Sequence, residues 1–204
     1  MKTLFATRLY EATLAADRGF DDFIAELEDA CRGVADDDEA GQAWCEAKGY
    51  AGYTSYASLN DLPRRASIFA DLKKKLDRHA ATFAEQLGFD LGGEKLVLDS
   101  IWINILEPGG AHSGHIHPHS VISGTVYVDI PDGASAIRFE DPRLPMMMAA
   151  PTRRADAAED LQTFVSVSPQ AGTVLMWESW LRHEVPANQA EAERISVSFN
   201  YGLK

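Results

Sequence analysis

The sequence predicts an α+β fold in which a β-sandwich or jelly roll is supported by helices packed outside it. The first observation is a change of period. Apolar residues recur every three or four positions in roughly the first ninety residues and every second position after Gly92-Gly93. The second observation is that the later half holds many short strand-like stretches separated by turn residues. A helical start followed by many short strands is typical of such a fold.

Composition favours one globular domain. The chain has 204 residues, of which 46% are hydrophobic and 25% are charged, which is ordinary for such a domain. We expect a single domain over residues 1–204, with residues 1–92 as mainly helical support and residues 93–204 as the β core.

Charge and hydropathy argue against nucleic acids and membranes as binding partners. The formal net charge of -12 argues against a nucleic-acid surface, which needs clustered Lys and Arg. No apolar stretch has the length of a membrane span, and the amino terminus lacks the apolar core of a signal peptide. We therefore expect a cytoplasmic protein without a membrane partner, in which the two cysteines, Cys31 and Cys45, are small buried thiols.

The first ninety residues are predicted to be mostly helical after an extended lead over residues 3–9. A helix begins near Asp21, and the acidic run Asp36-Asp37-Asp38-Glu39 predicts an exposed break after it. The Gly- and Tyr-rich residues 49–56 are predicted to be irregular. A second helix runs from about Arg65 and ends at Gly88. The apolar faces of the two helices comprise Phe23, Ile24, Leu27 and Cys31, and Phe69, Leu72, Leu76, Ala80, Phe83 and Leu87.

The remaining residues alternate as strands do. Two long strands are predicted over residues 96–106 and 121–130, each with one apolar and one polar face. Their polar faces comprise Ser100, Trp102 and Asn104, and Ser123, Thr125 and Tyr127. Shorter strands are predicted over residues 136–139, 163–168, 173–177 and 194–201. Residues 141–160 have no clear period and predict a long loop, either a lid or a disordered insertion.

Histidines are concentrated in two places. Four of the six lie between His112 and His119, and a fifth is His183. On a strand, His115 and His117 project from one face, so with His183 they form a facial set that suits a first-row metal ion. His112 has the wrong parity unless Gly114 kinks the strand, and the direction of His119 after a proline stays open. The alternative is a surface cluster that binds zinc adventitiously or only forms hydrogen bonds.

A second feature lies about ten residues after His183. Alternation places Arg194, Ser196, Ser198 and Asn200 on one face of the last strand. A guanidinium inside a sandwich needs an anion, and a carboxylate bound by Arg194 and Ser196 would supply it. The alternative is an ion pair with Glu191 or Glu193.

Taken together, His115-Ile116-His117, the distal His183 and Arg194-Ile195-Ser196 resemble the 2-oxoglutarate- and Fe(II)-dependent dioxygenases over residues 96–201. The resemblance implies a double-stranded β-helix, a cupin-like jelly roll. It also implies Fe(II) held by the three histidines, and 2-oxoglutarate held at its far carboxylate by Arg194 and Ser196. Asn104 and Tyr127 are expected beside that co-substrate.

The implied reaction consumes dioxygen, converts 2-oxoglutarate to succinate and hydroxylates a small molecule or a protein side chain. One departure is that His117 stands where the family usually has a carboxylate. Asp129, Glu140 or Glu178 could supply one from elsewhere in the chain.

Two other functions use the same residues. The three histidines could hold zinc in a hydrolase or lyase. A non-catalytic cupin-like module could instead sense a small acid through Arg194. The sequence indicates neither an oligomeric state nor a primary substrate.

Overall fold

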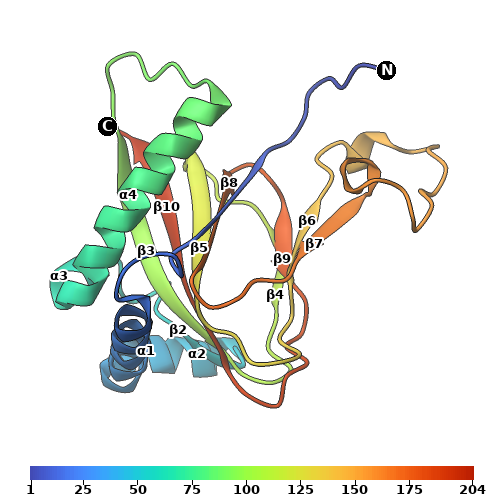
Figure 1. Cartoon of the computed structure of the whole chain (residues 1–204). Coiled ribbons are helices and arrows are strands. Elements are labelled where there is room, and N and C mark those ends of the chain that lie inside the picture. Colours follow the sequence, from blue (N-terminus) through green and yellow to red (C-terminus); the bar gives the residue numbers. More distant parts are fainter.

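The computed structural model describes all residues from Met1 to Lys204 (Figure 1). The helices are α1 (Phe20–Asp37), α2 (Glu39–Lys48), α3 (Leu62–Arg65), α4 (Ser67–Leu87) and the 3-10 turns η1 (Leu144–Met146) and η2 (Glu159–Leu161). The strands are β1 (Leu9–Thr13), β2 (Gly52–Thr54), β3 (Leu96–Leu106), β4 (His112–His115), β5 (Ile122–Asp129), β6 (Ile137–Glu140), β7 (Phe164–Val167), β8 (Thr173–Glu178), β9 (His183–Val185) and β10 (Arg194–Leu203).

The strands form two antiparallel sheets that face each other (Figure 1). The larger sheet has the order β1-β8-β5-β10-β3-β2, and the smaller has the order β4-β9-β6-β7. The α+β prediction is therefore confirmed, with the helices on the outer face of the larger sheet and the sheets arranged as a double-stranded β-helix. Two strands from the first 92 residues, β1 and β2, form the two edges of the larger sheet.

The alternation of each long strand separates a helix-facing core from the interior of the sandwich. The apolar residues of β3, β5 and β10 pack with α1 and α4 in one core of 25 buried residues. A smaller cluster of 8 buried residues, including Tyr127, Phe139 and Trp177, lies between the sheets. The polar faces predicted for β3, β5 and β10 thus point into the sandwich, where a site can form.

Three of the predictions for the first ninety residues are wrong. Residues 49–56 are not irregular throughout, because Gly52–Thr54 form β2, which pairs with β3. The extended segment is β1 at Leu9–Thr13, later than the predicted lead, and it pairs with β8. The acidic run is not an exposed break, because α1 continues to Asp37 and Asp38 is only 9% exposed. The Asp38 carboxylate begins α2 by accepting from Gly41 N at 3.1 Å. The predicted end of α4 at Gly88 is confirmed, and both cysteines are free and buried.

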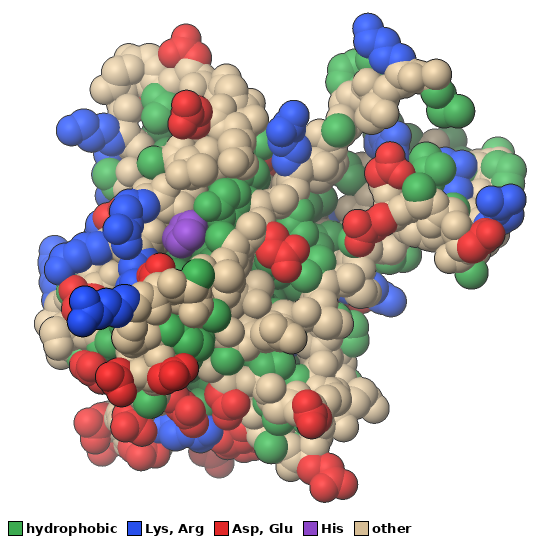
Figure 2. Space-filling model, viewed as in Figure 1, with side chains coloured by type: hydrophobic (Ala, Val, Ile, Leu, Met, Phe, Trp, Pro, Cys, Tyr) green, Lys and Arg blue, Asp and Glu red, His purple; other side chains and the backbone are tan.

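Residues 141–163 form an arm between β6 and β7 that projects from the body of the molecule (Figures 1 and 2). No residue of this arm is buried, and Met146 and Met148 are exposed. The predicted loop is confirmed, and it contains the two short 3-10 turns. None of the helices in the fold has the length and apolar character needed to span a membrane.

Candidate metal and co-substrate site

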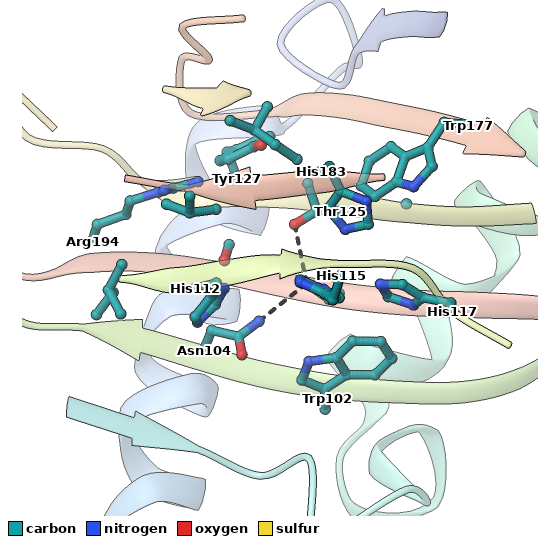
Figure 3. A pocket seen from close by; sticks show the side chains of 16 residues that line it. Trp102, Asn104, His112, His115, His117, Thr125, Tyr127, Trp177, His183 and Arg194 are labelled. Carbon is teal, nitrogen blue, oxygen red and sulfur yellow. Dashed lines mark hydrogen bonds between the residues drawn. The ribbon is translucent and has the colours of Figure 1, made fainter. Parts of the chain in front are cut away.

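Three histidines meet at one end of the pocket between the sheets (Figure 3). His115 ends β4 and pairs directly with His183 at the start of β9, while His117 follows β4. The backbone N–H of His117 donates to Ser179 O at 3.0 Å, which ties this residue to the turn before β9. One ring nitrogen of each histidine lies within 4.8 Å of the other two. The chain thus brings together the three histidines that the sequence singled out.

Hydrogen bonds leave the same nitrogen free on each ring. Nδ1 of His115 bonds to Ser113 O at 2.7 Å, and Nδ1 of His183 bonds to Leu181 O at 2.9 Å. Nδ1 of His117 lies 2.7 Å from Asn200 Oδ1. Because each partner is a carbonyl oxygen, Nδ1 carries the proton and Nε2 has a free lone pair. His117 Nε2 is buried without any hydrogen-bond partner, as a metal-ligating nitrogen is before the ion binds.

None of the three carboxylates considered as substitutes for His117 belongs to the histidine cluster. Two of them lie close to arginines instead. Glu140 binds Arg182 at 3.2 Å, and Asp129 lies 3.8 Å from Arg32. Glu178 is not part of the histidine group, which contains no carboxylate. The group that could hold a metal ion here therefore consists of three imidazoles.

His112 also enters the pocket, although it is not part of the metal group. His112 pairs with Val185 on β9, and His115 pairs with His183. The two residues are therefore three positions apart on β4, while their partners are two positions apart on β9. This irregularity between His112 and His115 reverses the parity, and His112 lines the pocket. His119 is exposed and has a positive φ of 70°. The kink that Gly114 permits is thus present.

Arg194 lies at the other end of the pocket from His117 (Figure 3). It is 3% exposed, and its Nε and Nη1 have no hydrogen-bond partner. The alternative of an ion pair with a neighbouring acid is wrong, because Arg194 forms none and Glu193 binds Arg32 at 2.7 Å. Its guanidinium carbon lies 5.1 Å from the Tyr127 ring centroid. A buried cation without an anion is costly, so this arrangement fits a ligand that supplies one.

A chain of hydrogen bonds runs across the pocket floor from β2 to β5. Thr54 Oγ1 donates to Asn104 Oδ1 at 3.0 Å, and Asn104 Nδ2 donates to Ser198 Oγ at 3.0 Å. Ser198 Oγ then donates to Thr125 Oγ1 at 3.4 Å. In the next row, Ser196 lies between Asn104 and Tyr127 on neighbouring strands. Of the ten residues predicted on the polar faces of these strands, Ser100, Ser123 and Asn200 lie outside the pocket lining. The other seven line the pocket: Trp102, Asn104, Thr125, Tyr127, Arg194, Ser196 and Ser198.

Burial favours the neutral form of two of the imidazoles, His117 and His183. It lowers the pKa of His117 to about 4, against the opposing effect of the Asn200 hydrogen bond. It lowers the pKa of His183 to about 3, although the bond to Leu181 O acts to raise it. Burial also lowers the pKa of Arg194, and raises that of Tyr127 to about 12. The end of the pocket with neutral histidines therefore suits a metal ion, and the end with the Arg194 cation suits an anion.

Some functional partners have no sequence signal. Tyr50 lies in the stretch predicted to be irregular, yet its hydroxyl lies 2.6 Å from His112 Nε2. Trp177 lines the pocket with its ring centroid 4.6 Å from that of His183. Asn200 was placed on the pocket face by alternation, but its bond to His117 joins residues 83 positions apart. Only the folded chain shows such pairings.

The fold and the site define a metal-binding protein of the double-stranded β-helix class. A family comparison matches residues 100–200, about half of the chain, to the family described as "Putative 2OG-Fe(II) oxygenase". The chain belongs to this family of 2-oxoglutarate- and Fe(II)-dependent oxygenases, as the sequence resemblance implied. A search of curated proteins found no match at the sequence level.

Solved structures support the same fold. A prolyl-4-hydroxylase from Pseudomonas putida is 15% identical, with a TM-score of 0.58 over 96% of this chain and 92% of that one. SnoN, a non-heme alpha-ketoglutarate-dependent epimerase from nogalamycin biosynthesis, is 16% identical, with a TM-score of 0.64 over 97% and 77%. HygX from Streptomyces hygroscopicus, with nickel and 2-oxoglutarate bound, is 16% identical, with a TM-score of 0.59 over 97% and 82%. At these identities the likeness establishes the fold alone.

Proposed function

We propose that this protein is an oxygenase that uses Fe(II), 2-oxoglutarate and dioxygen to hydroxylate a small molecule or a protein side chain. One observation carries the proposal. Three imidazoles with free Nε2 atoms and a buried, unpaired Arg194 line the same pocket. A metal ion alone would account for the histidines, and an acid alone would account for the arginine. A metal-chelating oxo acid with a second carboxylate accounts for both.

The residues present fit these groups. His115, His117 and His183 would hold the metal, since His117 Nε2 is buried with no partner in the protein. Arg194 and Ser196 would hold the far carboxylate, with Tyr127 and Asn104 beside it. Three protein ligands leave three positions on an octahedral ion, enough for a bidentate oxo acid and one further ligand.

The cofactors supply the oxidative chemistry when bound: one atom of dioxygen enters succinate as 2-oxoglutarate loses carbon dioxide, and the other enters a substrate C–H bond. The chain itself binds and orients. The Asn200 amide and two backbone carbonyls hold the imidazoles in one tautomer. The pocket floor fixes the Asn104 amide, and Arg194 sets the position of the co-substrate at the opposite end from His117.

Three neutral ligands leave the full charge of the metal uncompensated, whereas a carboxylate would offset part of it. We therefore expect weaker Fe(II) affinity than a site with a carboxylate ligand would show. A mutation of His117 to aspartate would test this, with Fe(II) affinity measured against a chelator. Unchanged or weaker affinity in His117→Asp would contradict the idea that charge limits metal binding.

The proposal is tested with purified protein loaded anaerobically with Fe(II). We expect 2-oxoglutarate to produce a weak visible absorption band, and oxygen to produce succinate even without a primary substrate. His183→Ala should lose both signals. Arg194→Met should lose 2-oxoglutarate binding while it keeps the metal. An iron-loaded protein that gives neither the band nor succinate would contradict the oxygenase function.

The same experiment separates the other functions. A zinc hydrolase or lyase should retain zinc rather than iron when isolated from cells, and should show no oxygen-dependent succinate. A sensing module should bind 2-oxoglutarate without consuming it. A cytoplasmic location is also part of the proposal, supported by two cysteines that stay unpaired.

A further inference from the structure

The Arg194 end of the pocket holds a polar pair that the metal site does not use. His112 lines the pocket together with Arg194 and Tyr127. Its Nε2 lies 2.6 Å from the hydroxyl of Tyr50, a residue outside the pocket lining, and the two rings stack with centroids 5.7 Å apart. His112 is therefore held from behind by a phenol while its ring contributes to the pocket wall.

The phenol determines which ring nitrogen of His112 carries the proton. The Tyr50 hydroxyl has no other hydrogen-bond acceptor within the protein, so its proton is satisfied only by donation to Nε2. Burial raises the pKa of Tyr50, which keeps this proton in place. Burial, assisted by the charge of Arg194, also lowers the pKa of His112 to about 4. The imidazole is thus neutral with its proton on Nδ1, which forms no hydrogen bond to the protein.

Other donors at this end also lack partners. Arg194 Nε and Nη1 and the Tyr127 hydroxyl are buried with no hydrogen bond. A carboxylate can accept more hydrogen bonds than the two that a guanidinium donates to it. Further neutral donors beside Arg194 would therefore strengthen carboxylate binding. A neutral imidazole suits the place beside Arg194, because a second cation there would repel the first.

We propose that His112, in the Nδ1–H tautomer set by Tyr50, is a further binding residue for the far carboxylate of 2-oxoglutarate. This rests on the proposed function, since it needs 2-oxoglutarate to bind with that carboxylate toward Arg194. Tyr50 acts through His112 and is a positioning residue. The bulge between His112 and His115 makes the pair available, because a regular β4 would turn His112 away from the pocket.

Affinity is measured by calorimetry on protein loaded with Ni(II), with 2-oxoglutarate and with 2-oxobutyrate, which lacks the far carboxylate. His112→Gln places an amide near the position of Nε2 and leaves no donor at the position of Nδ1. We therefore expect it to weaken 2-oxoglutarate binding about tenfold. His112→Asn keeps a donor where Nδ1 was and should stay within about threefold of the natural protein. Binding of 2-oxobutyrate should be the same in all three.

Nuclear magnetic resonance of metal-free protein with ¹⁵N-labelled histidine gives an independent result. The signals that vanish in His112→Gln identify His112, and they should report the Nδ1–H tautomer. Tyr50→Phe should leave the fold intact, shift His112 toward a mixture of tautomers and weaken 2-oxoglutarate binding by a smaller factor.

The outcomes are distinct. Equal 2-oxoglutarate affinity in His112→Gln, an Nε2–H tautomer in the natural protein, or an equal loss of 2-oxobutyrate binding would each overturn the role of His112. Failure of the natural protein itself to bind 2-oxoglutarate would overturn the proposed function, and the role of His112 with it.

Discussion

The imidazole of His117 is held by one side chain, the amide of Asn200, whose Oδ1 also accepts from Ser123 Oγ at 2.7 Å. The Asn200 Nδ2 donates to Ser100 Oγ at 2.9 Å, which fixes the orientation of the amide. His115 and His183 instead bond to backbone carbonyls that no mutation removes. His117 is thus the proposed ligand whose orientation can be changed by substitution of another residue.

Replacement of Asn200 by leucine removes this acceptor at similar size. We expect Asn200→Leu to weaken Co(II) or Fe(II) binding about tenfold or more, the usual effect of losing the partner of a ligating histidine. Affinity is measured by competition with a chelator. Ser100→Ala is the matched control, since it removes a contact of the same amide and leaves the acceptor in place. Equal losses in the two variants would assign the effect to packing.

Arg194 presents a conflict between stability and binding. Its guanidinium is buried with two unpartnered nitrogens, which costs free energy until an anion is bound. We expect Arg194→Met to raise the free energy of unfolding of the ligand-free protein by about 1 kcal/mol. The same change should remove the stabilisation that 2-oxoglutarate gives the metal-loaded natural protein. Urea unfolding with and without 2-oxoglutarate measures both effects, and a less stable Arg194→Met would contradict a cost of burial.

Among the elements, α2 depends on a buried carboxylate. Asp38 accepts from Gly41 N, from the Tyr53 hydroxyl at 2.8 Å and from the Ser58 hydroxyl at 2.5 Å. Burial acts to raise the pKa of Asp38, but these hydrogen bonds prevail and hold it below the ordinary value. The stability that the ionised carboxylate contributes is therefore present at neutral pH and is lost as the pH falls through this lowered pKa.

We expect Asp38→Asn to lower the free energy of unfolding by about 1 to 3 kcal/mol at pH 7, because an amide nitrogen must face a hydroxyl donor. The difference from the natural protein should shrink below about pH 3.9, where aspartate begins to protonate. Urea unfolding at pH 7 and at pH 3.5 measures it. Asp37→Asn, one residue earlier and exposed, is the control. A difference that stays constant with pH would contradict the role of the charge.

The elements that the sequence predicted well are those with long, regular patterns. β3 occupies the predicted residues 96–106, and α4 ends at Gly88 as expected. The faces of β3, β5 and β10 were also correct, because burial on one side imposes alternation. The short strands β6, β7 and β8 also lie close to their predicted residues, whereas β2, β9 and α2 were missed. β9 has three residues, too few for a period, and α2 contains a glycine and none of the large aliphatic residues that mark a helix face.

The candidate site was predictable in part for the same reason. His115, His117 and His183 were found by residue type and parity, and Arg194 by an unexplained charge on an apolar strand. Parity alone left the direction of His112 open, and the bulge that decides it lies between His112 and His115. Tyr50, which sets the tautomer of His112, is 62 positions away and comes close only through the pairing of β2 with β3. Such contacts depend on the whole topology.

On the scale of the whole molecule, the two sides of the larger sheet have different tasks. Its outer face buries the main core against α1 and α4, and its inner face carries the polar pocket. The polar residues inside are therefore supported by a core that does not include them. This division lets the site keep unpaired groups such as Arg194, because the helix-facing core supplies the stability they cost.

The arm of residues 141–163 belongs to neither side. It has no buried residue, and its hydrogen bonds are mostly internal, such as those from Gln162 Nε2 to Arg154 O and Ala157 O. The hairpin that carries it is closed by the bond from Asp141 N to Thr163 O at 2.8 Å. Replacement of residues 143–161 by a short Gly-rich turn keeps that bond. We expect the free energy of unfolding to change by less than about 1 kcal/mol.

Metal and 2-oxoglutarate affinities should also be unchanged in the arm-deleted protein, because none of the arm residues lines the pocket. Urea unfolding and calorimetry on the Ni(II)-loaded protein measure these quantities. Phe164, which follows the arm and lies against Arg138 with 4.8 Å between the ring centroid and the guanidinium carbon, is kept to preserve β7. Loss of metal binding would show that the arm supports β6 and β9. It would then also support the ring of His183, which lies beside Phe139 of β6. Unchanged affinities would show that the arm is needed for neither metal nor 2-oxoglutarate binding, so that any role it has would concern the primary substrate.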